Sequence, residues 1–354
     1  MRARHPLPRA RPTQSLMQFQ NVSILGLAHV DAPHRTTSEE ICERLGPTLS
    51  RMGMGSDLLE SASGITARRF WDVGFQPSDA ATLAAEKCLS EVGLDRRRVD
   101  VLISTSVCRD YVEPSVACLV HGNLGLPASC LNFDVGNACL AFLTGMQIAG
   151  NMIERGQIEH ALIVDGEGAR EAVEATIARL LRPQTTPQDL RDQFATLTLG
   201  SGGVAMLLAR RDLAPNGHRF IGAVERSATQ HRGLCRGQVD GMYTDGKALL
   251  ANGILLARET WGFAQRSLGW QADTLDDIVL HQVSASHTTQ LLETLGLEPE
   301  KALAIYPEFG NIGPASVPIV LSKSREAGRL EKGMRVGLLG IGSGLNCCMA
   351  EIVW

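Results

Sequence analysis

Asn132-Phe133-Asp134-Val135-Gly136-Asn137-Ala138-Cys139-Leu140-Ala141-Phe142 is the stretch that organises this chain. Its pattern predicts the end of a strand, a tight glycine turn and the start of a helix, with Cys139 on the first helical turn. The first N–H groups of a helix have no partner within the helix and lie at the positive end of its dipole. We therefore expect the thiol of Cys139 to be stabilised as a thiolate beside N–H groups that can hold an oxyanion, which makes it a candidate nucleophile.

Apolar runs with strand character alternate with helical patterns on both sides of this turn. Strands are predicted over 22–28, 99–107, 160–165 and 204–209, and helices over 78–92 and 140–155. The same scheme returns later in the chain, with strands predicted over 219–226, 277–283, 335–341 and 345–353, and helices over 249–268 and 316–327. This alternation is typical of an α/β fold.

The two parts also resemble each other in their residues. Gly136-Asn137 opens a helix that leads to a predicted strand before Gly166, and Gly310-Asn311 opens a helix that leads to a predicted strand before Gly340. The spans 136–166 and 310–340 are equal in length. We therefore expect two similar α/β halves, 19–212 and 213–354, packed about a pseudo-twofold axis with their equivalent loops at one site.

Two segments fall outside the repeat. Residues 1–18 begin rich in Arg and Pro and precede no apolar run long enough for a signal sequence or a membrane span, so they are predicted to be a disordered arm. Residues 171–198 are helical in pattern, are interrupted at Pro183 and Pro187, and have no counterpart in the second half. We interpret them as an insertion that covers one face and lines a substrate pocket.

The composition excludes several classes of protein. A chain of 354 residues with 44% hydrophobic and 20% charged residues can bury a large core. Its net charge of −4 provides no basic surface for nucleic acid. Nine cysteines stand at irregular spacing without a Cys-x-x-Cys pair or a Cys/His cluster, so we expect no metal site and a reducing compartment, the cytoplasm.

Two further residues join Cys139 as candidates. His281 directly follows a predicted strand, at the carboxyl edge where α/β active sites form, although a lone histidine in such a place is more often structural. Asn311 occupies the position equivalent to Asn137 in a loop flanked by glycines, and by itself it fits an ordinary turn asparagine. Together with Cys139, on repeated loops, they make a Cys-His-Asn constellation.

As a set, these motifs resemble the thiolase superfamily of condensing enzymes, in its β-ketoacyl-(acyl carrier protein) synthase III branch. The resemblance covers residues 19–354 and rests on Gly64-Ile65 with Arg68-Arg69, the Cys139 turn, Leu199-Gly200-Ser201-Gly202-Gly203-Val204-Ala205, His281-Gln282, Gly310-Asn311 before Ala315-Ser316-Val317-Pro318, and Gly340-Ile341-Gly342-Ser343-Gly344. The last glycine run is not a dinucleotide fingerprint, because no strand-turn-helix unit with a downstream acidic residue follows it.

The resemblance implies a thiolase-like fold with αβαβα layers and a two-step reaction. Cys139 would accept an acyl group from a thioester, and a second thioester would then attack that group in a Claisen condensation. His281 and Asn311 would hydrogen-bond the enolate oxygen of the second substrate, and the backbone N–H groups of Cys139 and Ser343 would form the oxyanion hole of the acyl-enzyme. Coenzyme A thioesters would be substrates, with no separate cofactor.

Glu113, in Tyr111-Val112-Glu113-Pro114-Ser115, departs from the synthase III pattern. The family has an apolar residue at this position, which reaches into the channel of the partner subunit. A carboxylate at a helix start is also a common surface arrangement. A glutamate in an apolar acyl tunnel, however, would be desolvated and become a stronger base. With this residue the chain resembles the OleA-type condensing enzymes of long-chain olefin biosynthesis.

Such enzymes join two fatty acyl-CoA molecules without decarboxylation and release a 2-alkyl-3-keto acid. The resemblance assigns Glu113, donated across a homodimer, as the base that removes the α-proton of the second acyl-CoA. Two alternatives remain at this point: a decarboxylative synthase III that uses malonyl thioesters, and an inactive thiolase-fold partner subunit. Enzymes that process a β-keto acid are the expected downstream partners, and the sequence leaves open the acyl length and the choice between CoA and acyl carrier protein.

Overall fold

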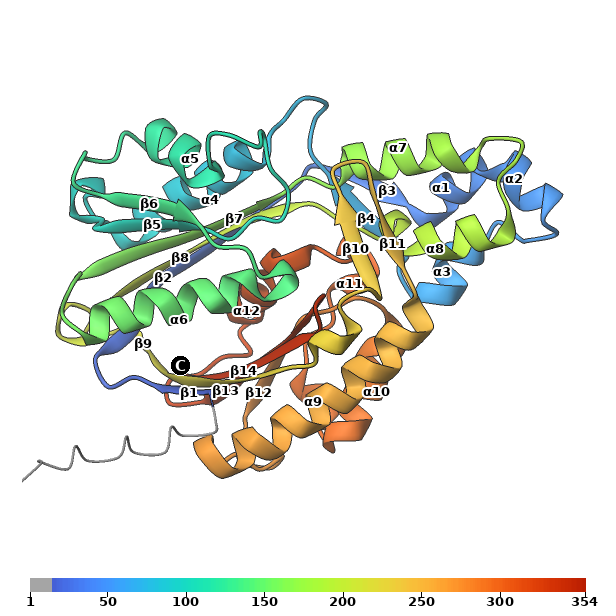
Figure 1. Cartoon of the computed structure of the whole chain (residues 1–354). Helices are drawn as coiled ribbons and strands as arrows, with labels where there is room; N and C mark the ends of the chain where they lie inside the picture. Colours follow the sequence, from blue (N-terminus) through green and yellow to red (C-terminus); the bar gives the residue numbers. More distant parts are fainter. Residues whose placement is uncertain (1–14) are drawn as a thin grey trace, which may run out of the picture.

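The computed structural model describes residues 15–354, and a ten-stranded sheet runs through its centre (Figure 1). Along this sheet the strand order is β12 (Asp277–Leu280), β13 (Arg335–Gly342), β14 (Asn346–Val353), β9 (His218–Ser227), β2 (Val22–Asp31), β8 (Gly202–Arg210), β7 (His160–Glu167), β5 (Val101–Ser104) and β6 (Leu131–Asp134). A further strand, β1 (Ser15–Gln18), pairs with β9.

The sheet consists of two half-sheets with the same strand order. They join where β2 meets β9, through the pairs Ser23–Arg219 and Ile24–His218. One half runs β6-β5-β7-β8-β2, and the other runs β12-β13-β14-β9, which is the same order without a strand equivalent to β6. Where a strand equivalent to β6 would lie, beside β12, Ala302 makes an isolated parallel bridge to Ile278. The two pseudo-symmetric halves expected from the sequence repeat are therefore confirmed.

Helices and half-sheets alternate in five layers (Figure 1). The outer face of the first half-sheet is covered by α4 (Pro77–Val92) and α5 (Val116–Leu124). Between the half-sheets lie α6 (Ala141–Glu154) and α12 (Ser316–Glu326), and the outer face of the second half-sheet is covered by α9 (Gly246–Leu268) and α10 (Ala285–Leu295). This is the αβαβα arrangement that the resemblance implies, and the predicted α/β class is confirmed.

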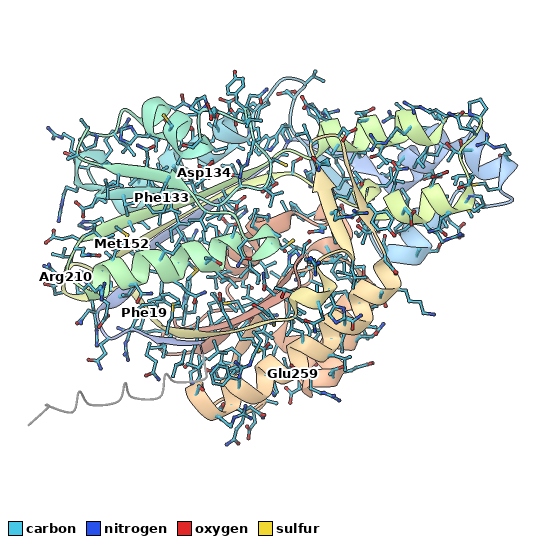
Figure 2. All side chains as sticks on the ribbon, in the orientation of Figure 1. Phe19, Phe133, Asp134, Met152, Arg210 and Glu259 are labelled. Atoms are coloured by element: carbon cyan, nitrogen blue, oxygen red, sulfur yellow. The ribbon has the colours of Figure 1, made fainter. Side chains whose placement is uncertain are left out.

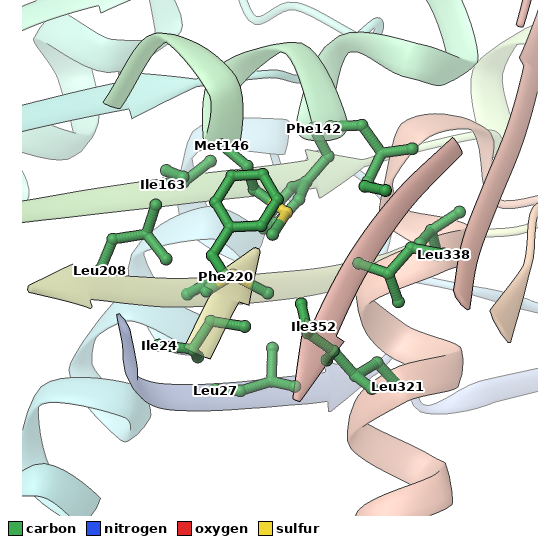
Figure 3. Close-up of a cluster of buried hydrophobic side chains, with 14 of the residues drawn as sticks. Ile24, Leu27, Phe142, Met146, Ile163, Leu208, Phe220, Leu321, Leu338 and Ile352 are labelled. Carbon is green, nitrogen blue, oxygen red and sulfur yellow. The ribbon is translucent and has the colours of Figure 1, made fainter. Parts of the chain in front are cut away.

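The layer between the half-sheets holds the largest cluster of buried apolar side chains (Figure 3). Phe142 and Met146 of α6 lie there beside Phe220 of β9, while Leu321 of α12 lies near Ile352 of β14. Strands β7 and β8 are buried almost throughout, which explains their continuous apolar sequences. As a result α6, and the turn that precedes it, is held by both halves of the molecule.

The predicted insertion forms two helices, α7 (Arg170–Leu180) and α8 (Pro187–Leu197), the second beginning at its proline. They pack with α1 (Ser38–Arg44), α2 (Gly46–Arg51) and α3 (Leu58–Ser63) around a separate apolar cluster, at the right of Figure 1. The hairpin of β10 (Cys235–Gln238) and β11 (Gly241–Thr244) lies against α8. The small pair of β3 (His34–Thr37) with β4 (Ala67–Phe70), and the single turn α11 (Tyr306–Phe309), complete the fold.

The end of the predicted N-terminal arm is ordered. Ser15–Gln18 form β1, in which Leu16 lies opposite Val224 and Met17 opposite Ala223 of β9. A disordered arm is therefore wrong for residues 15–18, because β9 offers them a free edge beyond its short contact with β2. The rest of the arm, residues 1–14, lies outside the described residues. From residue 15 onward, no helix combines the length and the apolar character needed to cross a membrane.

Candidate active site

The loops at the carboxyl ends of the two half-sheets meet around Cys139. The turn η2 (Ala138–Leu140), which contains Cys139, contacts both the end of β13 and the turn η6 (Gly313–Ala315). Asn346 Nδ2 donates a hydrogen bond of 3.1 Å to Asn137 Oδ1, which ties the Cys139 turn to the start of β14. The convergence expected from the repeat is thus present in the fold.

A strained residue precedes Cys139. Ala138 has a φ of 44°, in the left-handed region, where its Cβ costs roughly 1–2 kcal/mol. Two hydrogen bonds hold this sharp turn, from Leu140 N to Asn137 O at 3.0 Å and from Asn137 Nδ2 to Thr144 Oγ1 at 3.0 Å. The turn changes the chain direction abruptly before α6 and brings Cys139 to the sheet edge where the loops meet.

Burial dominates the electrostatics of Cys139. Although part of the residue is accessible, enclosure of the thiol raises its pKa to about 12, and Cys235, Glu167 and Asp165 act in the same direction. This loss of solvation opposes the stabilisation of a thiolate that the N–H groups at the helix start offer. The raised pKa favours the protonated thiol, which then transfers its proton when it attacks a substrate.

His281 supplies a neutral imidazole at the end of β12. The residue is only 2% exposed, and its backbone N–H donates to Leu339 O at 2.8 Å. Its buried Nδ1 has no hydrogen-bond partner within the described part of the chain, so the structural alternative, a fully hydrogen-bonded histidine, is wrong. Burial and then His287 lower the pKa of His281 to about 3. A neutral ring has one N–H group, so it can donate a hydrogen bond to an oxygen that gains charge.

Asn311 is held with its amide nitrogen free to donate. Its side-chain Oδ1 accepts a hydrogen bond of 3.0 Å from Gly313 N, while its backbone N donates to Thr198 O at 3.0 Å. Gly310 beside it has a φ of 66°, and a Cβ there would stand 2.5 Å from Thr198 O, so the loop requires glycine. With Oδ1 fixed in this way, Nδ2 is the remaining polar group of the side chain.

The end of β13 lies against the backbone of Cys139. A Cβ on Gly342 would stand 3.4 Å from Cys139 N and 3.2 Å from Leu140 Cγ. A side chain at this position would make the neighbouring Leu140 give way by a few tenths of an ångström, so the segment that leads into Ser343 lies close to the Cys139 turn. The part of the Ser343 N–H in an oxyanion hole stays a prediction.

Glu113 lies apart from the site of its own chain. Its side chain is exposed, and among residues 15–354 it takes part in no hydrogen bond or ion pair. The neighbouring Tyr111 and Val112 are 60% and 87% exposed, which is unusual for such side chains. The turn η6, which closely follows Asn311, contacts the Cys139 turn, and Gln282 after His281 donates to Ser316 at the end of η6. Glu113, in contrast, is exposed on the loop after β5.

A cavity of about 530 Å³ opens between the insertion and α9. Leu190, Arg191 and Phe194 of α8 line it from one side, and Leu58 of α3 and Lys247 at the start of α9 line it from the other. The insertion thus lines a pocket, and its use by a substrate stays a prediction. Besides apolar side chains, the lining contains two cationic groups, Arg191 and Lys247, and two carboxyl groups, Asp192 and Asp245.

Comparison with known proteins identifies the family of the chain. Residues 133–228 match the 3-oxoacyl-(acyl-carrier-protein) synthase III family, and residues 266–354 match the C-terminal part of the same family. An acyl-CoA:acyl-CoA alkyltransferase of Xanthomonas campestris is 54% identical over 338 residues, covering 96% of this chain and 100% of the relative. The chain belongs to the synthase III family. A second acyl-CoA:acyl-CoA alkyltransferase, from Shewanella oneidensis, is 37% identical over 350 residues, with 96% and 100% covered.

Solved structures agree with this family membership. Xanthomonas campestris OleA superposes with a TM-score of 0.94 at 53% identity, covering 98% of this chain and 100% of that one. The same enzyme with bound lauric acid and lauroyl-CoA gives a TM-score of 0.93 at 54% identity, with 95% and 100% covered. The thiolase-like fold described above is therefore shared with a solved enzyme of the synthase III family.

Sequence analysis missed two buried acids beside the site, Asp165 and Glu167 at the end of β7. Burial raises the pKa of both carboxyl groups. The available signal was their position at the carboxyl end of an otherwise apolar strand, the edge where active sites form in α/β proteins. In residues 15–354, no group of three or more His, Cys, Asp or Glu side chains is arranged to hold a metal ion.

Proposed function

We propose that this chain joins two fatty acyl-CoA molecules in a non-decarboxylative Claisen condensation. The products would be a 2-alkyl-3-keto acid and coenzyme A, which is the first step towards long-chain olefins or ketones. Two relatives are acyl-CoA:acyl-CoA alkyltransferases, and OleA has been solved with lauric acid and lauroyl-CoA bound. Coenzyme A thioesters serve as substrates, and the proposed chemistry needs no separate cofactor.

In the first step Cys139 takes up an acyl group. The thiol of Cys139 loses its proton as Sγ attacks the thioester carbonyl. The oxyanion is stabilised by the N–H groups of Cys139 and Ser343. The carbonyl re-forms, the C–S bond to coenzyme A breaks, and the leaving thiolate receives the proton. This step uses groups of one chain.

In the second step Glu113 removes the α-proton of another acyl-CoA. The enolate oxygen accepts hydrogen bonds from His281 and from Asn311 Nδ2, which its fixed oxygen leaves available. The enolate carbon attacks the acyl group on Cys139, and the thiolate of Cys139 departs. Water then hydrolyses the product thioester, which releases the second coenzyme A and the free keto acid.

The glutamate is the feature that favours this reaction over its nearest alternative. A malonyl donor produces a carbanion by losing CO₂, whereas a simple acyl-CoA needs a base. OleA has been solved in variants that change a glutamate, a cysteine and a histidine. Those three residues stand at the same intervals along OleA as Glu113, Cys139 and His281 along this chain, which supports their assignment here.

We infer that the protein is a homodimer in which Glu113 enters the site of the partner. The outer edge of β6 has no neighbouring strand in the described chain, and Leu131 on it is 55% exposed. Val112 beside Glu113 is also exposed. Pairing of β6 with its copy would continue the sheet and cover these apolar side chains.

We also propose that the protein works in the cytoplasm. Its nine cysteines, all within the described residues, form no disulfide, as expected of a reducing compartment. Enzymes that process a β-keto acid are the partners that its product requires.

Incubation with myristoyl-CoA alone tests the proposed function. We expect release of coenzyme A together with a long-chain β-keto acid or its ketone decay product. A strict requirement for a malonyl thioester would instead support the decarboxylative alternative. Intact-mass measurement should detect an acyl adduct in the wild type and none in Cys139→Ala, and absence of any adduct would indicate an inactive subunit. Repeating the assay with acyl carrier protein thioesters determines the carrier.

A further inference from the structure

Glu167 connects two of the loops that the proposed reaction uses. It ends β7, and only 4% of the residue is exposed. Its Oε1 accepts a hydrogen bond from Val107 N at 2.6 Å, and its Oε2 accepts one from Cys108 N at 3.3 Å. These two N–H groups begin the loop that leads from β5 to Glu113. The carboxylate therefore fixes the start of the loop that carries the base.

The same carboxyl group lies against the Asn311 loop. A Cβ on Gly313 would stand 3.6 Å from Glu167 Cδ, and Gly313 is the residue whose N–H holds the side-chain oxygen of Asn311. The backbone of Glu167 is anchored in turn, because its carbonyl accepts a hydrogen bond of 3.0 Å from Trp71 Nε1. One side chain on a rigid strand thus contacts both loops.

A buried acid at this place is costly for the fold. No ion pair in the described part of the chain includes Glu167, and burial raises its pKa. Asp165, two residues earlier on the same strand, is fully buried as well, with Oδ2 bound to Thr105 Oγ1 at 2.6 Å and Oδ1 unpartnered. Apolar side chains would fill this strand end at lower cost, so the acids point to a requirement of the site.

We propose that Glu167 is a positioning residue for condensation, which fixes the loop that carries Glu113 towards the partner's site and supports the Asn311 loop of its own site. This inference rests on the proposed function. Acylation of Cys139 uses neither Glu113 nor the amide of Asn311, whereas enolate formation uses both. Glu167 also raises the pKa of Cys139, so its replacement by a neutral side chain should not slow acylation. Loss of the Glu167 contacts should therefore slow the second step without slowing the first.

Glu167→Gln tests this assignment with little change of shape. Both oxygens of Glu167 accept N–H groups, whereas glutamine has one acceptor and turns an NH₂ group towards the other donor. Glu351→Gln is a matched control, because Glu351 is also 4% exposed but lies on β14 with Trp270 and Arg335 as its partners. Both variants remove one buried carboxylate.

The rate of acyl-Cys139 formation and the turnover to keto acid are measured with myristoyl-CoA. We expect Glu167→Gln to lower turnover by about 10-fold to 100-fold, the range of a small misplacement of reacting groups, while acylation is not slowed. Glu351→Gln should keep the wild-type ratio of the two rates. Equal loss of both steps in Glu167→Gln, or loss of neither, overturns the proposal.

Hydrogen exchange of the segment 105–115 gives a readout that does not depend on the reaction. Exchange should accelerate in Glu167→Gln and stay unchanged in Glu351→Gln, and equal exchange in Glu167→Gln and wild type overturns the anchoring role. If the wild-type protein makes no keto acid, the proposed function is refuted. The hydrogen-exchange data then test the anchoring role of Glu167 on their own. If Glu167→Gln does not fold, Glu167→Asp is used in its place. The shorter aspartate side chain cannot reach both N–H groups, so this variant should also slow condensation without slowing acylation.

Discussion

A mixture of two inactive variants tests whether Glu113 acts across a dimer. The Glu113→Ala chain keeps Cys139, and the Cys139→Ala chain keeps Glu113. In a mixed dimer, the site on the first chain would receive Glu113 from its partner and be complete, while the other site would lack both groups. Neither homodimer contains a complete site. Activity from the mixture therefore requires that the two residues of one site come from different chains.

The structure sets the size of the expected effect. Glu113 is exposed and makes no hydrogen bond in the described chain, so its removal should cost about 0.5 kcal/mol of stability or less. A general base contributes about 10²-fold to 10⁴-fold, which is the expected loss of condensation in Glu113→Ala. With random pairing, half of the dimers are mixed and each has one complete site of two, which gives about a quarter of wild-type activity. The mixture should thus exceed Glu113→Ala alone by about 25-fold to 2,500-fold.

The two chains are produced together with different affinity tags, and keto acid is measured after incubation with myristoyl-CoA. Glu259→Ala is the control, since Glu259 is an exposed acid on α9, away from the Cys139 turn (Figure 2). It should leave activity unchanged. Activity of the mixed dimer no higher than the average of the two separate variants would refute donation across the interface. Full condensation by Glu113→Ala alone would remove this residue from the mechanism.

Three further predictions concern the groups around Cys139. Burial lowers the pKa of His281 from 6.5 to about 3. Between these two pH values the unfolded chain binds a proton that the folded chain does not. The free energy of unfolding therefore falls as the pH drops from 6.5 towards 3. In urea unfolding, His281→Asn should reduce the dependence of the unfolding free energy on pH by up to about 1.4 kcal/mol per pH unit. An unchanged dependence would contradict a buried neutral imidazole. Because the pKa of Cys139 is about 12, its alkylation by iodoacetamide, followed by mass spectrometry, should rise about tenfold per pH unit well above neutral pH, whereas a plateau near neutrality would indicate a stabilised thiolate. Gly342→Ala places a Cβ 3.2 Å from Leu140 Cγ and 3.4 Å from Cys139 N, so a small shift of the turn should slow acylation by up to about 10-fold, and a normal acylation rate would contradict this tight packing against the Cys139 turn.

The sequence was sufficient for most of the fold because the buried elements are long and strongly patterned. The helix predicted over 78–92 is α4 (Pro77–Val92), and the strand predicted over 160–165 is β7 (His160–Glu167). The strand predicted over 99–107 was too long, since the chain leaves the sheet after Ser104 to form the loop of the site. Strand β1 was missed, because its partner β9 lies far away in the chain and no local pattern reports such pairing.

The site was predictable only as far as its residues follow local patterns. Cys139, His281 and Asn311 each stand at the end of a strand or the start of a helix, and the repeat links them. The pKa of Cys139 was not predictable, because it depends on enclosure by distant parts of the chain, including Cys235 and Glu167. Glu167 itself was missed because the predicted strand ended at Asp165.

The first proposed step starts from neutral side chains, whereas the second needs a charged base. Cys139 and His281 are both neutral, since burial raises the pKa of the thiol and lowers that of the imidazole. Neutral groups allow the acyl group to be loaded without a standing charge in the enclosed site, where an isolated ion would be costly. Removal of an α-proton needs a stronger base, and in the proposed dimer the exposed Glu113 would become desolvated only when the partner covers it. A single chain would then load its acyl group, and formation of the proposed dimer would activate the base that condensation requires.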